Sequence, residues 1–271
     1  MLRIGVIGAA GRMGSTVCRA VVEDPGLELV AAIDPSAAGR SLAEVAGTPD
    51  ELEMVVRTAI DVLADERVDV VVDFTLAAAA VEAMHWCAER GIACVSGTSG
   101  LSNEDLESLR EAFSVPGAPA CIWAPNFAIG AVLMMKMSEL AAPFFDSVEV
   151  IEMHHDGKRD APSGTAIETA RMMAAARTAA DKPSFNADPT RDFVMPGARG
   201  ATGEGSVHIH SLRMLGLVAH QEVIFGAAGQ TLSIRHDSHD RVGFMPGVIY
   251  AVKAAPNMSG LTVGLAAVLG I

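Results

Sequence analysis

The sequence has 271 residues, a length typical of one large domain or two ordinary ones. Half of the residues are hydrophobic but only 4% are aromatic, which favours α/β or helical packing over an aromatic-rich β-sandwich. The formal net charge of −13 argues against nucleic-acid binding, which needs a basic surface, although a local basic cluster can still bind an anionic small molecule.

The start of the chain and the cysteines predict a cytoplasmic protein. The first residues run directly into an apolar strand, so no signal peptide is expected, and no run of about 18 apolar residues suggests a membrane span. The four cysteines form no CxxC pair and are expected to be small buried side chains in a reducing compartment.

The first 125 residues alternate between short apolar runs and helical patterns. Strands are predicted at residues 2–7, 27–33, 68–74, 92–95 and 120–123. Helices are predicted at residues 12–22, 77–90 and 103–113. This alternation is typical of a Rossmann-like, doubly wound parallel sheet in an α/β protein.

The pattern changes after residue 125. Helices are predicted at residues 127–142, 165–178 and 243–252, and a long loop at 179–205. Strands are predicted at residues 147–154, 207–213, 218–225 and 231–235. The last three strands follow one another through short turns, so they predict an open sheet distinct from the first. The tail of the chain is apolar.

A glycine-rich loop follows the first predicted strand. Gly8, Gly11 and Gly14 form a GxxGxxG motif that opens a helix, where free N–H groups and the positive end of the helix dipole can bind a pyrophosphate. Asp34, about 20 residues further at the end of the second strand, can accept hydrogen bonds from ribose hydroxyls. The alternative is a glycine turn without a ligand, with Asp34 capping the turn before Pro35.

Two further strand ends point to the same ligand. Residues 73–75 (Asp-Phe-Thr) and 97–100 (Gly-Thr-Ser-Gly) each follow an apolar strand. Ligands of open α/β sheets bind at the carboxyl ends of the strands, so both loops can line the nicotinamide and its ribose. Each loop taken alone also fits an ordinary turn.

Residues 152–165 carry an unusually dense group of reactive side chains: two histidines, a lysine, an arginine, three carboxylates and a serine. A metal site is disfavoured because neighbouring histidines on a strand point in opposite directions and no other Cys or His has standard zinc spacing. A nucleophilic Ser163 is disfavoured because the sequence lacks a GxSxG elbow. A solvated loop whose charges pair with one another is the simplest alternative.

An anion-binding and proton-transfer site explains this cluster better. The Ser-Gly-Thr segment 163–165 precedes an Ala-rich helix, so its N–H groups can hold a carboxylate, and its threonine with Glu168 fits a capping box. His154 or His155 can exchange a proton near neutral pH, and Lys158 can supply a positive charge and a proton.

The pattern E-x-H-H-x-x-K-x-D-x-P-S-G-T at residues 152–165 resembles the signature of the dihydrodipicolinate reductase family. The resemblance extends, in order, over nearly the whole chain, at residues 8–14, 73–75, 97–100, 125–130, 216–222 and 235–238. It implies NADH- or NADPH-dependent reduction of 4-hydroxy-tetrahydrodipicolinate, a small cyclic dicarboxylate, to tetrahydrodipicolinate with loss of water, in lysine and diaminopimelate biosynthesis.

The resemblance also implies roles for residues and a division into domains. His154 would be the acid/base residue and Lys158 the proton donor. The implied substrate ligands are His155, Ser163, Gly164 and Thr165. Residues 1–125, completed by 237–271, would form the dinucleotide-binding domain. Residues 126–236 would form an α+β substrate domain whose open mixed sheet makes a homotetramer.

The cofactor is expected to be NADH and/or NADPH, and no metal is expected. The residues expected to bind the dinucleotide are Gly8, Ala9, Ala10, Gly11, Arg12, Met13, Asp34, Phe74, Gly97, Thr98, Ser99, Ala124, Pro125, Asn126, Phe127 and Arg241. Some members of the family carry Arg after the acidic strand-end residue, where this sequence has Pro35. Since Asp34 repels a 2′-phosphate and pairs with a free 2′-hydroxyl, we expect NADH to work at least as well as NADPH. Arg12 or Arg40 could still reach a phosphate, so use of both stays open.

Two other classes of protein share part of this pattern. Two-domain sugar or amino-acid dehydrogenases also begin with a glycine loop and use a Lys–His pair, but they lack the HHxxKxDxPSGT string. A redox-sensing regulator that binds a dinucleotide would need a nucleic-acid or partner-binding module, and the sequence has no basic helix.

Overall fold

The computed structural model describes residues 1–271 and divides into two compact units. Unit 1 comprises residues 1–129 and 241–271, and unit 2 comprises residues 130–240. The sequence placed these boundaries at 125/126 and 236/237. The first boundary lies later because Phe127 is buried and packs its ring 6.0 Å from the ring of Phe74, within unit 1.

Unit 1 is built on a six-stranded sheet of order β11-β5-β4-β3-β1-β2, in which every neighbouring pair is parallel. The strands are β1 (Leu2–Ile7), β2 (Leu27–Ile33), β3 (Val70–Asp73), β4 (Ala93–Ser96), β5 (Ala120–Trp123) and β11 (Gly260–Val263). Every residue of β3, β4 and β5 is buried, as expected for strands covered on both faces. The predicted Rossmann-like sheet is confirmed.

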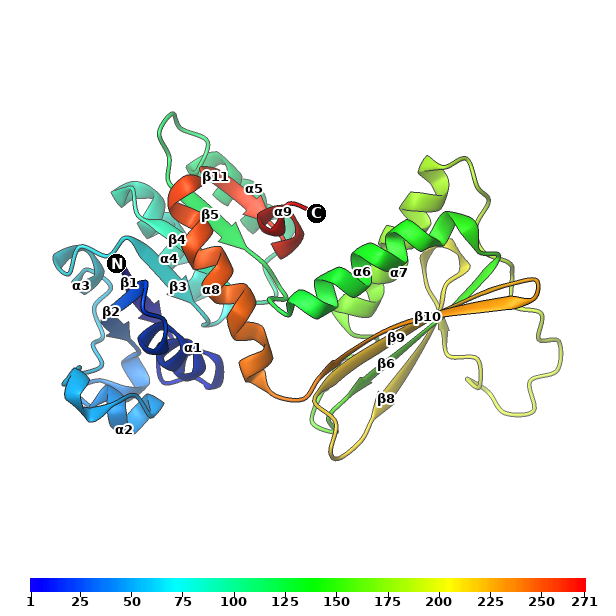
Figure 1. Ribbon diagram of the computed structural model, residues 1–271, viewed down its shortest axis with the longest axis horizontal. Coiled ribbons are helices and arrows are strands. Elements are labelled where there is room, and N and C mark those ends of the chain that lie inside the picture. The colour runs from blue at the N-terminus through cyan, green and yellow to red at the C-terminus, as the bar shows by residue number, and fades with distance from the viewer. The chain divides into compact units, whose positions relative to one another are not determined.

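Helices cover both faces of this sheet (Figure 1). They are α1 (Arg12–Glu23), α2 (Leu42–Ala46), α3 (Val62–Asp65), α4 (Ala77–Arg90), α5 (Asn103–Ala112), α8 (Met245–Ala254) and α9 (Leu265–Leu269). α1 packs against α8, and α4 packs against α5. α4 buries Ala80, Ala83, Met84 and Cys87, whose spacing of three and four residues places them on one helix face.

The short elements of unit 1 were not predicted. The sequence indicated only a helix near 243–252 and an apolar tail, but residues 260–263 form the edge strand β11 and residues 265–269 form α9. α2 and α3, between β2 and β3, were also missed. Each of these four elements has at most five residues, too few to show a hydrophobic period.

Unit 2 is an α+β unit with a five-stranded sheet of order β10-β9-β6-β8-β7. Its strands are β6 (Ser147–His154), β7 (Ala201–Thr202), β8 (His208–Arg213), β9 (Ala219–Ala227) and β10 (Gln230–Ser238), and its helices are α6 (Ile129–Ala141) and α7 (Gly164–Ala179). β6 and β8 are parallel, and the other neighbouring pairs are antiparallel. The predicted open mixed sheet is confirmed.

The two faces of this sheet differ. α7 covers one face, and the buried core there includes Val148, Val150, Met173, Val223 and Phe225. Side chains alternate along a strand, so Ile151, Met153 and Ile224 point to the opposite face, where they stay partly exposed. Unit 2 therefore has a sheet face with apolar side chains that its own core does not bury.

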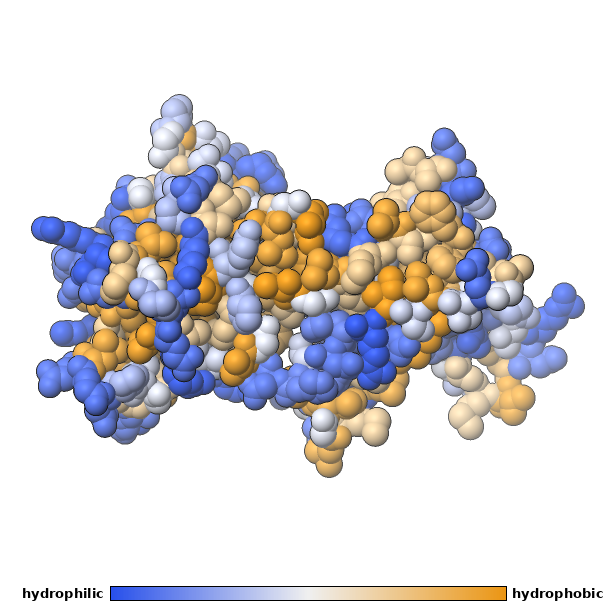
Figure 2. Space-filling view, viewed as in Figure 1, coloured by the Kyte–Doolittle hydropathy of each residue, from blue (hydrophilic) through white to orange (hydrophobic).

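Further apolar side chains are exposed along α6 and the turn that follows it. Leu133, Met137, Leu140 and Phe144 are 41% to 76% exposed and lie three or four residues apart, on one side of the helix. Figure 2 shows apolar side chains along α6 and also at the turn between β8 and β9. Unit 2 therefore also presents apolar side chains along α6 that its own fold does not bury.

The cysteines and the helices agree with two expectations from the sequence. All four cysteines are free and buried, as predicted. Burial raises the pKa of the Cys18 thiol to about 12, so this thiol stays protonated and behaves as a small apolar side chain. None of the helices combines the length and the apolar character needed to span a bilayer.

Candidate active site

The glycine loop joins β1 to α1. Gly8 has a φ of +80°, which glycine adopts readily, and a Cβ on Gly14 would lie 1.9 Å from the Gly8 carbonyl oxygen. These glycines allow the sharp turn and the close packing of α1 on the loop. Gly11 is the N-cap of α1 and provides no side-chain cap, so the amides of Arg12 and Met13 have no intrahelical acceptor. A pyrophosphate fits this helix end.

Asp34 supports the glycine loop from the end of β2. Its Oδ2 accepts a hydrogen bond from the Ala10 N–H at 2.9 Å. Its Oδ1 accepts from the backbone N–H and the hydroxyl of Ser36, at 3.0 Å and 2.6 Å. Asp34 therefore does cap the turn at Pro35, as the alternative interpretation proposed. The cap is compatible with a ribose ligand, because Oδ2 accepts only the Ala10 N–H and has a further lone pair.

A cavity of about 600 Å³ lies in unit 1 beside this loop. Its walls include Gly8, Gly11, Asp34, Phe74, Leu76 and Trp86. The cavity thus joins the glycine loop to the loop after β3, and it has the size and the mostly apolar walls of a small-molecule site. The glycine cradle, the uncapped helix and the acidic strand end together fit a dinucleotide.

Asp73, the last residue of β3, connects the ends of β3 and β4. Its buried carboxylate accepts hydrogen bonds from the hydroxyls of Thr75, Ser96 and Thr98 at 2.6 to 2.7 Å. Burial raises the pKa of Asp73, and these hydrogen bonds oppose the rise. The carbonyl oxygen of Thr98 accepts a hydrogen bond from the Trp123 indole at 2.8 Å. One network therefore fixes the loops after β3 and β4 relative to β5.

The remaining predicted cofactor residues lie mainly at the same edge of the sheet. Gly97 lies against Phe74, since a Cβ there would be 2.1 Å from the ring. Ser99 is exposed after β4, and Ala124 to Phe127 follow β5. Arg241 is exposed at the start of a 3-10 helix, Arg241–Phe244.

In unit 2, Glu152 and His154 lie on the same side of β6. Glu152 is completely buried, and its Oε2 lies 2.6 Å from Nδ1 of His154. Burial lowers the pKa of His154; Glu152 opposes this shift, and the positive charges of Lys158 and Arg213 add to it. At pH 7 the imidazole is therefore mostly neutral.

Lys158 lies in the loop after β6. Its ammonium donates hydrogen bonds to both carboxylate oxygens of Asp160, at 2.7 and 2.8 Å. The hydrogen bond from Lys158 lowers the pKa of Asp160, whose side chain is 64% exposed. Such an exposed ion pair is weak, so Lys158 can exchange Asp160 for an anionic substrate. His155, the other histidine, is exposed just beyond the strand.

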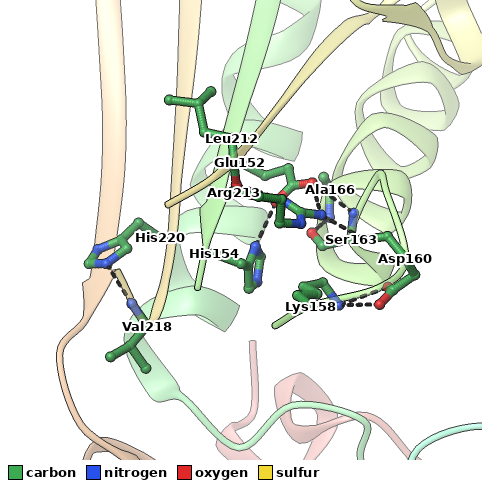
Figure 3. A network of polar contacts seen from close by, with 10 residues as sticks. All are labelled: Glu152, His154, Lys158, Asp160, Ser163, Ala166, Leu212, Arg213, Val218 and His220. Atoms are coloured by element: carbon green, nitrogen blue, oxygen red, sulfur yellow. Dashed lines mark hydrogen bonds and ion pairs between the residues drawn. The ribbon is translucent and has the colours of Figure 1, made fainter. Parts of the chain in front are cut away.

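α7 begins beside these groups. Ser163 has an extended backbone and is the N-cap, with its Oγ accepting a hydrogen bond from the Ala166 N–H at 3.2 Å. No atom lies within 4 Å of the position that a Cβ on Gly164 would take, so the helix start is open there. Figure 3 shows His154, Lys158 and Ser163 grouped at the end of β6 and the start of α7.

The predicted capping box at this helix is wrong. Thr165 lies inside the first turn of α7, and Glu168 forms an ion pair with Arg171 at 2.6 Å. Ser163 takes the cap instead because the backbone is held extended at that residue, where its N–H donates to Oε1 of Glu152 at 3.2 Å. The position of the helix start is thus set by a buried carboxylate from β6.

Arg213, at the end of β8, was not predicted from the sequence. In the parallel β6–β8 pairing Arg213 is opposite His154. Its guanidinium donates to both carboxylate oxygens of Glu152, at 2.8 and 2.9 Å, across 61 positions of sequence. The pairing of β6 with β8 gave no signal in the sequence. The only hint of a role for Arg213 was that it is an arginine at the end of the predicted strand 207–213.

The fold and the two sites define a class of protein. Unit 1 has a Rossmann-type site that fits a dinucleotide, and unit 2 has a histidine and a lysine beside an open helix start. These are the features of a reductase that depends on a nicotinamide dinucleotide and acts on a small anionic substrate.

Comparison with known proteins identifies the family. The families described as "Dihydrodipicolinate reductase, N-terminus" and "Dihydrodipicolinate reductase, C-terminus" match residues 2–127 and 130–269. The 4-hydroxy-tetrahydrodipicolinate reductase of Cutibacterium acnes is 45% identical over 271 residues, which is 100% of each chain. The chain belongs to the dihydrodipicolinate reductase family.

Comparison with solved structures supports the assignment to this family. The dipicolinate-bound dihydrodipicolinate reductase from Paenisporosarcina sp. TG-14 has a TM-score of 0.85 and 39% identity, with 98% of each chain covered. A myo-inositol dehydrogenase from Corynebacterium glutamicum has a TM-score of 0.61 at 17% identity, covering 96% of this chain and 90% of its own. The second likeness shows the fold alone, so the rival dehydrogenase class shares the architecture.

Proposed function

We propose that the chain reduces 4-hydroxy-tetrahydrodipicolinate to tetrahydrodipicolinate with loss of water, using NADH or NADPH, in lysine and diaminopimelate biosynthesis. The observation that carries this proposal is the grouping of His154, Lys158 and the start of α7 in a chain of net charge −13. A dicarboxylate substrate accounts for cationic and amide donors gathered in an otherwise acidic protein. The related dipicolinate-bound reductase structure supports the same substrate class.

The residues of unit 2 have distinct roles in this proposal. When bound, the nicotinamide supplies the hydride. Reduction of an electron-poor ring leaves negative charge, which the Lys158 ammonium or a protonated His154 quenches with a proton. The substrate carboxylates are held by His155, Ser163 and the amides of Gly164 and Thr165, which lie at the positive end of the α7 dipole.

The residues of unit 1 hold the dinucleotide in this proposal. The amides of Arg12 and Met13 bind the pyrophosphate, and Asp34 accepts hydrogen bonds from the ribose hydroxyls. Phe74, the loop at 97–99 and the segment 124–127 lie at the strand ends and line the nicotinamide side, together with Arg241. Gly8 to Gly11 provide the cradle that these contacts need.

Asp34 sets the cofactor preference. Its carboxylate repels the 2′-phosphate of NADPH and pairs with the free 2′-hydroxyl of NADH, so kcat/KM with NADH should equal or exceed that with NADPH. Steady-state rates with each cofactor at saturating substrate measure this ratio. A preference for NADPH of about tenfold or more would contradict this assignment of Asp34.

The proposed assembly is a cytoplasmic homotetramer formed through the sheet of unit 2. The partly exposed Ile151, Met153 and Ile224 on the sheet face opposite α7 support it, because large apolar patches mark protein interfaces.

A coupled assay tests the function against its rivals. The unstable substrate is generated in the cuvette by the aldol condensation that precedes this step in the pathway, and NADH absorbance is followed. Consumption of NADH only when the condensation runs supports the proposal. Oxidation of a sugar alcohol or an amino acid with NAD instead would indicate the rival dehydrogenase class, and no turnover with any of them would indicate a regulator.

A further inference from the structure

Glu152 has more polar partners than a simple ion pair needs. Its carboxylate is completely buried and accepts hydrogen bonds from the Ser163 N–H, from two nitrogens of Arg213 and from His154. Burial alone would raise the pKa of Glu152, but the hydrogen bonds from Arg213, Ser211 and His154 together lower it. Glu152 is therefore ionised and acts only as an acceptor.

An acceptor at this place fixes the tautomer of His154. A carboxylate has no proton to donate, so the 2.6 Å contact requires Nδ1 of His154 to carry the hydrogen. Nε2 is then the nitrogen that is free to take up or release a proton. The ionised groups acting on this imidazole are Glu152 on its own strand, Arg213 on β8 and Lys158 in the loop.

Arg213 extends the arrangement to the loop that carries Lys158. Besides its two bonds to Glu152, the guanidinium donates to the carbonyl oxygens of Leu212 and Asp160, each at 2.7 Å. Asp160 is the residue whose carboxylate holds the Lys158 ammonium. The Glu152–Arg213 pair thus touches the strand of His154, the loop of Lys158 and the start of α7 (Figure 3).

We propose that Glu152 and Arg213 are positioning residues of the proposed reductase. The pair fixes the Nδ1–H tautomer of His154 and holds the Lys158 loop and the start of α7 in place beside it. This inference rests on the proposed function. It adds that the pair acts through His154 and not through contact with the substrate. Neither residue belongs to the groups that bind the substrate in that proposal.

The chain contains a matched control. Glu149 lies on the same strand, points to the opposite face of the sheet, and is likewise paired with an arginine, Arg199, and with a histidine, His210, at 2.5 Å. Glu149→Gln removes a carboxylate from an Arg–Glu–His cluster that has no contact with His154. Any general effect of losing such a charge from β6 should appear in both variants.

The first test compares Glu152→Gln with Glu149→Gln and the unmodified protein. In Glu152→Gln, kcat should fall about 100-fold or more while the affinity for NADH stays unchanged, because the amide no longer enforces the reactive tautomer. The His154 limb of the pH–kcat profile should move down by about 1 pH unit or more, since the carboxylate that favours the charged ring is gone. Glu149→Gln should show neither change. An equal loss in both variants, or a fall in kcat with an unmoved pH limb, overturns the proposal.

A second measurement does not depend on turnover. NMR of the ¹⁵N-labelled histidines, with the His154 signals assigned by a His154→Gln variant, reports which nitrogen carries the hydrogen. Nδ1–H in the unmodified protein and a mixed or reversed tautomer in Glu152→Gln support the proposal; Nε2–H in the unmodified protein overturns it. This readout stands even if the chain reduces a different substrate, so failure of the proposed function and failure of the positioning role are distinguishable.

A double variant controls for a loss of stability in Glu152→Gln. Glu152→Gln leaves the partly buried Arg213 guanidinium without its charged partner, which can destabilise the fold. The double variant Glu152→Gln/Arg213→Met removes both charges and should fold, and it should show the same change in tautomer. A double variant that keeps the Nδ1–H tautomer and full kcat overturns the proposal.

Discussion

The proposed role of Lys158 in proton transfer can be measured separately from cofactor binding. It lies in unit 2 and forms an ion pair with the exposed carboxylate of Asp160, so truncation leaves no buried charge unpaired. We predict that Lys158→Ala lowers kcat by about 10²- to 10⁴-fold, the usual contribution of general acid catalysis, and leaves the NADH dissociation constant unchanged. Lys182→Ala, at an exposed loop position, is the control for lost charge. Equal losses of turnover and cofactor affinity in Lys158→Ala would argue against its assigned role.

A substitution at Gly14 tests the proposed role of the glycine loop in binding the cofactor. A Cβ there would lie 1.9 Å from the Gly8 carbonyl oxygen and 2.6 Å from its carbon, and backbone atoms cannot yield cheaply. We expect Gly14→Ala to cost about 1–3 kcal/mol of stability and to weaken NADH binding, as overpacking shifts α1 away from the loop. Thermal unfolding and cofactor titration measure both effects. Gly243→Ala, where nothing lies within 4 Å of the added Cβ, should change neither quantity. Unaltered NADH binding in Gly14→Ala would contradict the proposed role of the glycine loop in binding the cofactor.

At the scale of elements, the β9–β10 hairpin carries a pH-dependent contribution to stability. Hydrogen bonds from Arg235, and then from His220, lower the pKa of Asp237 from 3.8 to about 2. A lowered folded-state pKa means that the ionised form stabilises the fold above pH 4, and that this stabilisation is lost as pH falls toward 2.

The corresponding prediction concerns Asp237→Asn. Its urea midpoint should lie below that of the unmodified protein at pH 7, and the difference should shrink steadily between pH 4 and pH 2. Asp192→Asn, in the exposed long loop, should match the unmodified protein throughout. A difference that is the same at pH 2 and pH 7 would show that the carboxylate charge is not its source.

The elements that could be predicted are those whose pattern is long enough to repeat. α4 begins and ends at the predicted residues 77 and 90, and β2 and β6 match their predicted ranges. The start of α7 was harder, because Ser163 and Thr165 both fit a cap and the choice depends on Glu152, a distant residue. The parallel pairing of β6 with β8 was out of reach for the same reason: long-range pairing leaves no local period.

Across the whole molecule, the site residues also divide into those that the sequence could predict and those that it could not. The glycine loop, Asp34, His154, Lys158 and Ser163 could be selected because each is part of a short motif. Arg213 could not, because it joins the site only through strand pairing. Asp73 was noted as part of a loop, but its contacts to Ser96 and Thr98 depend on the order of the strands in the sheet.

The assembly gives a prediction for the whole molecule. We expect light scattering to report four times the 28.1 kDa mass of one chain, with the sheet of unit 2 as the interface. Ile224→Lys should lower this mass, because it replaces an apolar side chain of the proposed interface with a charged one. Val115→Lys, at a position of unit 1 that is 57% exposed, is the control. A tetramer that persists in Ile224→Lys would place the interface elsewhere.

We infer that this chain transfers a hydride from a nicotinamide to a cyclic dicarboxylate. The direct measurement uses NADH that carries deuterium at both C4 positions of the nicotinamide, substrate generated in place by the aldol condensation, and mass and NMR analysis of the product. We expect tetrahydrodipicolinate that carries one deuterium on a ring carbon. Tetrahydrodipicolinate without deuterium, or NADH left unconsumed in the presence of fresh substrate, would contradict it.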